Sequence, residues 1–108
     1  SIKALEDEGW ESLMVTYVAG SNYVDWEMLY ADLEAGEAMT MKREPENPHD
    51  ENAVLVLDKE GNKLGFIPAY RNKDLAARLD AGDEFRTILL QVDYEARVEK
   101  LFIEVFTK

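Results

Sequence analysis

The sequence predicts a mainly β fold of the β-rich α+β class: an OB-like curled sheet or small barrel of about six strands with two short helices. Strand-like segments outnumber helical ones along the chain. The helical segments are inserted between strands without regular alternation, which disfavours a parallel α/β sheet. Because so little helix is available to cover strand edges, a sheet that curls on itself is the expected arrangement.

The first part of the chain predicts two strands and a helix. Residues 12–19 are mostly apolar with β-branched and aromatic members, and turn-forming residues follow them, so they form the first strand. In residues 25–33 the apolar positions have helical spacing, with Asp25 as the expected cap and Gly36 beyond the end. Residues 37–43 alternate in side-chain type and form the next strand.

The middle of the chain predicts a β-hairpin. Residues 52–57 are almost continuously apolar, which indicates a strand covered on both faces. Residues 58–62 reverse the chain into a second strand, residues 63–67. Pro68 ends that strand because proline cannot donate to a strand ladder.

The last part of the chain predicts a second helix and two more strands. Asn72 is the expected cap of the helix, and Gly82 follows its end. Residues 84–92 and 98–106 read as strands, and residues 93–97 link them as an antiparallel pair. Periodicity also assigns these aromatic side chains to the core or to half-buried packing: Trp10, Trp26, Phe85, Tyr94, Phe102 and Phe106.

One loop stands out for its density of rigid and hydrogen-bonding residues, and we call it the corner loop (residues 45–52). A simple turn that reverses the chain does not require such a composition, so this loop is the best candidate for a functional surface. Its distinctive members are Pro45, Asn47, Pro48, His49, Asp50 and Asn52.

The charge and composition limit the possible partners and compartments. The formal net charge is −11, but residues 42–73 contain six basic and six acidic side chains and are neutral as a window. Cysteine is absent, which is typical of a reducing compartment. The acidic N-terminal segment, residues 1–12, does not resemble a signal peptide, and no apolar run is long enough to cross a bilayer. We therefore expect a cytoplasmic monomer without membrane contact, with residues 13–108 forming a single domain.

Little in the sequence supports catalysis. The chain has one histidine and no cysteine, and its serines stand at positions 1, 12 and 21 outside any nucleophile motif. The consecutive acids Glu6, Asp7 and Glu8 are interpreted as a solvated tail, because carboxylates on a flexible chain repel each other and diverge. We expect a protein that is not an enzyme and that has no metal and no cofactor.

Two segments resemble the signature of the HIRAN domain family. They are residues 43–54, reading REPENPHDENAV, and residues 64–68, reading LGFIP. The resemblance extends upstream to residues 18–20 and Tyr23, and it covers most of the chain from about Leu13 onward. The family implies a modified OB-type barrel, found alone in bacteria or fused to remodellers of stalled replication forks, where it recognises the 3′-hydroxyl end of single-stranded DNA.

The resemblance implies a DNA-end site in this chain. Tyr23 and His49 take the positions at which the family stacks rings on terminal bases, and Asp50 takes the position that accepts the hydrogen bond of the 3′-hydroxyl. Asn47 and Phe66 line the same pocket. Stacking contributes roughly 1–3 kcal/mol per base, and a carboxylate beside the sugar hydroxyl disfavours a strand that continues with a phosphate.

Phosphate contacts are sparse in this implied site. Asn22 stands where the DNA-binding relatives favour a basic residue, and Arg71 and Lys73 are the nearest cations beyond Pro68. Together with the acidity of the chain, this predicts weak binding to a single-stranded DNA end that falls steeply with added salt.

Alternatives remain open at the level of the residues. Asn47 and Asn52 are expected to tie the corner loop together, and for Asp50 a ligand contact and a loop-building role have equal support. Tyr23 has the alternative of covering the core as a lid.

The alternative function is an acidic interaction module for a basic protein partner, with weak or no DNA binding. Cations converging near Tyr23 and His49 would favour DNA, and acids around them would favour the partner. The cations in question are Arg43, Lys63, Arg71 and Lys73.

Overall fold

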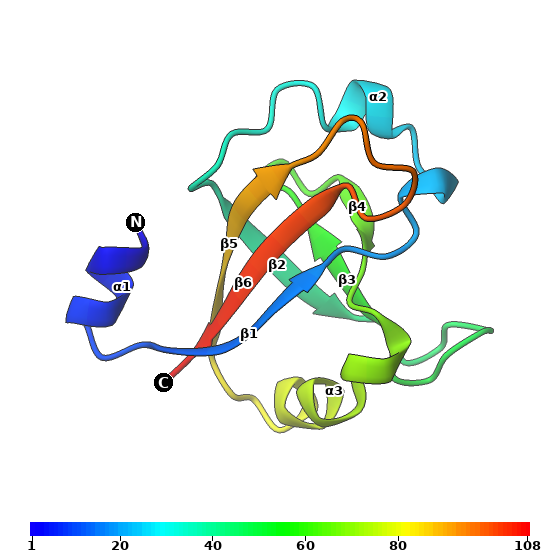
Figure 1. Cartoon of the computed structure of the whole chain (residues 1–108). Helices are drawn as coiled ribbons and strands as arrows, with labels where there is room; N and C mark the ends of the chain where they lie inside the picture. The colour runs from blue at the N-terminus through cyan, green and yellow to red at the C-terminus, as the bar shows by residue number, and fades with distance from the viewer.

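Six antiparallel strands form one strongly curled sheet in the order β1-β6-β5-β2-β3-β4 (Figure 1). The computed structural model describes all residues from 1 to 108. The strands are β1 (Glu11–Tyr17), β2 (Ala38–Arg43), β3 (Val54–Leu57), β4 (Lys63–Phe66), β5 (Phe85–Val92) and β6 (Leu101–Thr107). The predicted six-stranded, mainly β fold is confirmed.

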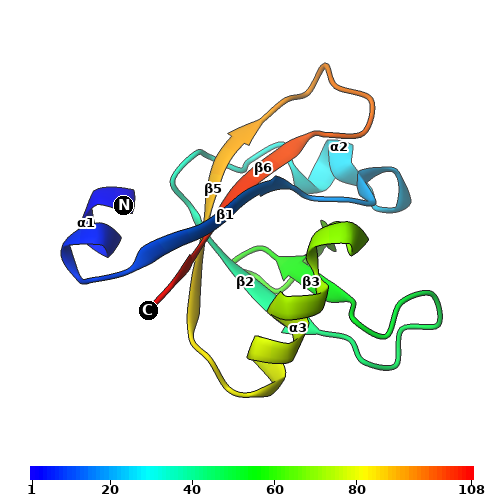
Figure 2. The ribbon, with the colours of Figure 1, turned by 60° about the horizontal axis from the view of Figure 1, so that its bottom comes forward.

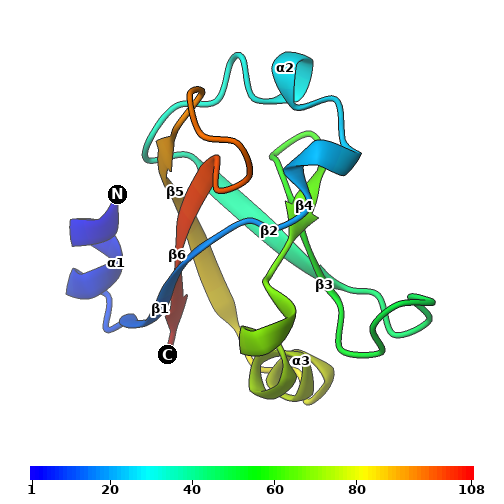
Figure 3. The same cartoon turned by 45° about the vertical axis from the view of Figure 1, so that its right-hand side comes forward.

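Three α-helices and two 3-10 turns accompany the sheet. They are α1 (Ile2–Asp7), η1 (Ser21–Tyr23), α2 (Trp26–Leu29), η2 (Ala69–Arg71) and α3 (Lys73–Asp80). The helices α2 and α3 lie at opposite open ends of the curled sheet (Figures 1 and 3). Figure 2 shows α1 on the outside of the sheet, away from both. None of these helices has the length and apolarity needed to span a membrane.

The helix predicted over residues 25–33 is wrong in its extent. Only Trp26–Leu29 is helical, and the side chain of Asp25 makes no capping hydrogen bond. Tyr30 ends the helix because its ring enters the core, where the hydroxyl donates to the carbonyl of Leu64 at 2.6 Å. Burial raises the pKa of Tyr30 to about 12, since it disfavours the phenolate.

The N-terminal segment also differs from the predicted flexible tail. It forms α1, whose first turn is capped by the Ser1 side chain accepting from the Ala4 amide. Although the acids of this segment are exposed, Ile2 and Leu5 pack on a small second core. That core lies on the outer face of the sheet and consists of Trp10, Ile88 and Phe106. A third helix therefore forms because an apolar surface is available to it.

The main core fills the inside of the curl. It is built from the inward positions of β2 to β6, with Met14 of β1 partly buried against them. The buried residues outside the strands are Val18, Tyr30, Ile67, Leu75 and Ala76. Five of the six aromatic residues that were assigned to packing are buried or half-buried, as predicted: Trp10, Trp26, Phe85, Phe102 and Phe106. Tyr94 is 48% exposed, with its hydroxyl donating to the carbonyl of Tyr30 at 2.8 Å.

A single backbone pair joins the two ends of the sheet. Ala19 and Phe66 form an antiparallel bridge, with the amide of Ala19 at 2.7 Å from the Phe66 carbonyl and the reciprocal bond at 2.9 Å. Gly65, with φ +149°, makes this approach possible: a Cβ there would lie 2.4 Å from the carbonyl oxygen of Ala19. The bridge fixes the loop after β1 against β4.

Candidate DNA-end site

The loop that follows β1 presents Tyr23 to solvent. Ser21 is buried and its hydroxyl donates to the carbonyl of Val98 at 3.1 Å, which ties η1 to the loop between β5 and β6. Tyr23, at the end of η1, is 87% exposed. The structure therefore does not have Tyr23 as a lid on the core.

Tyr23 and Phe66 both lie next to Gly20. A Cβ at Gly20 would lie 3.8 Å from Cδ2 of Phe66 and 3.9 Å from Cδ2 of Tyr23. The φ of +84° at Gly20 turns the chain at this point, as the change from strand to η1 requires. Phe66 is half-buried, so one aromatic side chain from η1 and one from β4 border the surface at Gly20.

Asn47 builds the corner loop from within. Its side-chain oxygen accepts from the amides of His49 at 2.8 Å and Asp50 at 3.1 Å. Its side-chain nitrogen donates to Glu44 Oε1 at 2.7 Å. These bonds form an Asx-type turn, which is the structural role expected for this asparagine. His49 is left exposed at the outer part of the loop.

Both carboxylate oxygens of Asp50 have partners inside the protein. One accepts from the amide of Asn52 at 2.8 Å, and the other accepts from the side-chain nitrogen of Asn72 at 2.7 Å. The sequence predicted that the Asn72 side chain caps α3, and this prediction is wrong. The side chain connects α3 to the corner loop instead. A carboxylate has about four lone-pair sites, so Asp50 keeps the capacity to accept a further hydrogen bond.

The four cations that were expected to decide between DNA and protein partners do not act as one cluster. Arg43 donates to the carbonyls of Ala53 and Glu51 and pairs with Asp80 at 2.9 Å. Arg71 is half-buried and donates to the carbonyl of Val15 at 2.7 Å.

The other two cations, Lys63 and Lys73, lie on different elements. Lys63 lies 3.9 Å from Glu44, and Lys73 is exposed at the start of α3. Asn22 is exposed in η1, beside Tyr23 in the chain. None of the cation–ring contacts in the structure involves Tyr23 or Phe66.

Two exposed residues near these elements were missed by the sequence reasoning. Val98 was assigned to a strand but lies in a loop, 56% exposed, because β6 begins only at Leu101. The strand starts late because Lys100 turns inward, with its ammonium 3.8 Å from the centre of the Trp26 ring. Tyr70 in η2 is 75% exposed, and its position just after Pro68 was the only signal available for it.

Comparison with protein families and curated proteins gives consistent matches. The model of the HIRAN domain matches residues 12–106. The Fanconi-associated nuclease 1 homolog of Arabidopsis thaliana is 29% identical over 79 residues, which are 73% of this chain and 8% of that protein. The helicase-like transcription factor of Oryctolagus cuniculus is 42% identical over 43 residues, which are 40% of this chain and 4% of that protein. The chain therefore spans less than a tenth of these relatives.

Solved structures share the fold. A crystal structure of a protein from Lactobacillus plantarum aligns with a TM-score of 0.76 and 28% identity, covering 92% of this chain and 97% of that one. The crystal structure of the HIRAN domain of human HLTF aligns with a TM-score of 0.70 and 22% identity, covering 88% of this chain and 75% of that one. Since the family model matches nearly the whole chain and the fold agrees, this protein belongs to the HIRAN domain family.

Proposed function

We propose that this chain is a non-catalytic module that binds single-stranded DNA at its 3′-hydroxyl end. The observation that carries the proposal is that the side chains of Tyr23 and Phe66 both lie next to Gly20, with the Tyr23 ring exposed. An aromatic ring that is 87% exposed has no packing role to explain it, whereas a terminal base offers a flat surface on which it stacks.

The corner loop supplies the polar part of the proposed site. His49 offers a second ring for stacking, on a loop whose backbone Asn47 holds in place. Asp50 accepts the terminal hydroxyl with a carboxylate already oriented by Asn52 and Asn72, so little conformational entropy is lost on binding. A phosphate in place of the hydroxyl would bring negative charge against Asp50 and remove the donor.

The same structure supports weak affinity. Arg71 and Arg43 are engaged with the protein itself, and Asn22 cannot neutralise a phosphate. With few cations to release counterions, binding depends on stacking and hydrogen bonds. The module is then expected to bind single strands weakly but to distinguish a 3′-hydroxyl end from a 3′-phosphate end. Its affinity is best measured at low salt.

The test is fluorescence anisotropy at low salt with two oligonucleotides that differ only at the terminus, one with a 3′-hydroxyl and one with a 3′-phosphate. We expect tighter binding of the hydroxyl form. Tyr23→Ala removes one stacked base, worth roughly 1–3 kcal/mol, or about 5- to 150-fold in affinity. Met28→Ala is the matched control, because Met28 is 67% exposed in the neighbouring helix α2. Equal binding of both oligonucleotides contradicts the proposal.

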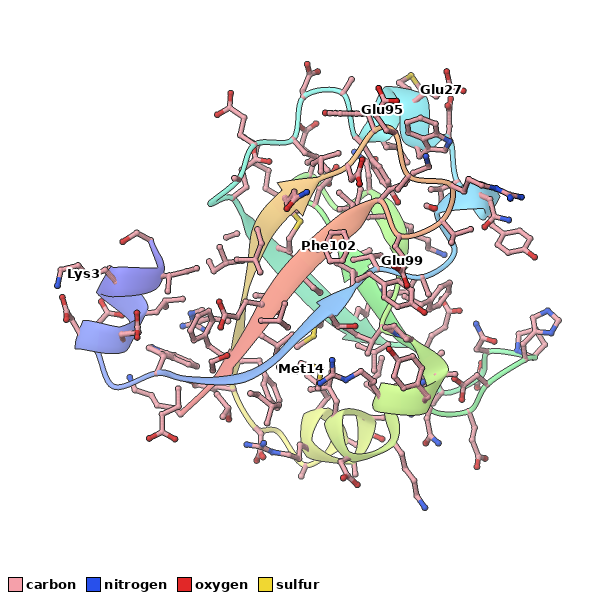
Figure 4. All side chains as sticks on the ribbon, viewed as in Figure 1. Lys3, Met14, Glu27, Glu95, Glu99 and Phe102 are labelled. Atoms are coloured by element: carbon pink, nitrogen blue, oxygen red, sulfur yellow. The ribbon has the colours of Figure 1, made fainter.

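A second candidate function is a protein-interaction module for a basic partner. Residues 25–37 carry five acids and no base, and residues 93–99 carry three acids and one base. Tyr94 and Lys100 hold these two segments together through Tyr30 and Trp26. Figure 4 labels Glu27 and Glu95 at this end of the molecule.

An acidic surface of this kind attracts a basic protein through electrostatic steering. Calorimetric titration with a lysine-rich peptide tests this alternative at physiological salt. Binding of the peptide without any binding of DNA would favour it over the DNA-end proposal.

A further inference from the structure

A row of residues crosses the outer face of the sheet from the candidate site toward the middle strand β2. Ala19 pairs with Phe66, Phe66 with Leu55, and Leu55 with Lys42. Side chains of paired residues point to the same face of a sheet. The Phe66 ring therefore shares its face with Leu55 and Lys42, two strand spacings away, or about 10 Å.

An open groove of about 320 Å³ occupies this face, and its lining includes Leu55, the strand partner of Phe66. Leu55 and Leu57 of β3 line it together with Lys42 of β2 and Lys63 of β4. The start of the corner loop borders one side and the turn between β3 and β4 borders the other. Figure 3 shows the corner loop projecting beyond the strands. The groove and the candidate site are therefore neighbours that share the corner loop.

The charge of the groove differs from that of the rest of the protein. Lys42 is exposed and takes part in no ion pair of the structure. Lys63 has only a long contact of 3.9 Å with Glu44, and its side chain is 67% exposed. Glu44 is also held by Asn47 at 2.7 Å. Glu46 and Arg43 also line the groove, so its lining carries three bases against two acids on a chain with a net charge of −11. The two ammonium groups are the charges that remain available to a polyanion.

We propose that this groove binds the DNA strand on the 5′ side of the terminal nucleotide. This inference rests on the proposed function, because the strand enters the groove from the end site over Phe66. Lys42 and Lys63 contact successive phosphates, while the half-buried Leu57 takes the apolar face of a sugar or base. Leu55 is only 3% exposed and forms the floor of the groove. Lys42 lies two strands away from Phe66, so the groove contributes mainly to oligonucleotides that extend beyond the terminal nucleotide.

The groove also explains how an acidic chain holds a strand at all. Lysine acts on phosphate as a point charge and releases condensed counterions, which contributes a salt-dependent part to the affinity. In single strands each neutralised phosphate contributes about 0.7 to the slope of log K against log salt, so two lysines contribute about 1.4.

The test uses the double variant Lys42→Gln with Lys63→Gln, and the control is Lys3→Gln with Lys59→Gln. Both variants change the net charge equally, and all four lysines are exposed, so folding is preserved. Two probes with a free 3′-hydroxyl are compared by anisotropy across a salt series: a dinucleotide and an octanucleotide. A third probe is the octanucleotide with a 3′-phosphate.

We expect the groove variant to weaken octanucleotide binding about tenfold at low salt and to lower its salt slope by about 1.4, with dinucleotide binding unchanged. The control variant leaves both within about twofold. If the groove variant affects both probes equally, or neither, the groove is not the path of the strand. If the unaltered protein binds the octanucleotides with a 3′-hydroxyl and with a 3′-phosphate equally well, end recognition is rejected instead. Absence of all binding would reject both proposals.

Discussion

Replacing Gly65 by alanine perturbs the one backbone bridge that joins the ends of the sheet. The new Cβ would lie 2.4 Å from the carbonyl oxygen of Ala19 and 2.6 Å from Cγ1 of Val18, distances that require the two strands to separate. Separation removes the two hydrogen bonds between Ala19 and Phe66, at about 0.5–1.5 kcal/mol each. Backbone strain at the φ of +149° adds about 1–3 kcal/mol.

The expected loss is therefore about 2–6 kcal/mol, a large fraction of the 5–15 kcal/mol that is typical of a domain. Urea unfolding followed by tryptophan fluorescence measures it. Gly82→Ala is the matched control: its φ is +89°, but a Cβ there meets nothing within 4 Å, so it reports the conformational cost alone, about 1–2 kcal/mol. If Gly65→Ala is no more destabilising than Gly82→Ala, the close approach to Ala19 is not what requires glycine.

Three further changes test the packing and the corner loop. Tyr30→Phe should cost about 1–3 kcal/mol, since it leaves the Leu64 carbonyl without its partner. The pKa of the tyrosine is near 10 in the unfolded chain and about 12 in the folded one, so the native protein should lose up to about 3 kcal/mol of stability as pH rises between these values. Tyr30→Phe should not show this loss, and urea titrations at pH 9 and pH 11.5 compare the two proteins. Trp10→Ala should cost about 3–5 kcal/mol by loss of the outer core, measured by circular dichroism in urea. Asn72→Ala should free one oxygen of Asp50 and lower discrimination between 3′-hydroxyl and 3′-phosphate ends in the anisotropy assay, whereas unchanged discrimination would show that this bond does not orient the carboxylate.

The strands were largely predictable from the sequence because alternation and β-branched residues are local signals. The helix limits were not, since tertiary contacts decide them. Tyr30 leaves the helical path to donate to Leu64, and Lys100 leaves the strand path to lie under Trp26. A helical pattern in α1 is too short to be recognised without the outer core that it covers.

The residues proposed for the candidate site come from the sequence, whereas their geometry could not be predicted from it. The composition of the corner loop pointed to Asn47 and Asp50, and the structure shows what holds each of them. The bridge between Ala19 and Phe66 is a contact between distant parts of the chain, so no local pattern reveals it. The partner of Asp50 is likewise distant: Asn72 has the sequence position of a helix cap, and its actual hydrogen bond depends on how α3 meets the loop.

The bond from Arg71 to Val15 has a consequence for self-association. As the first strand of the sheet, β1 has β6 on one side only, and Leu13 and Val15 are 37% and 49% exposed along it. An exposed edge strand can pair with another chain through its unpaired N–H and C=O groups. Because the guanidinium of Arg71 occupies the Val15 carbonyl, a neighbouring molecule cannot form a hydrogen bond with this group of the edge strand. Substitution of Arg71 should therefore increase aggregation of the protein at high concentration.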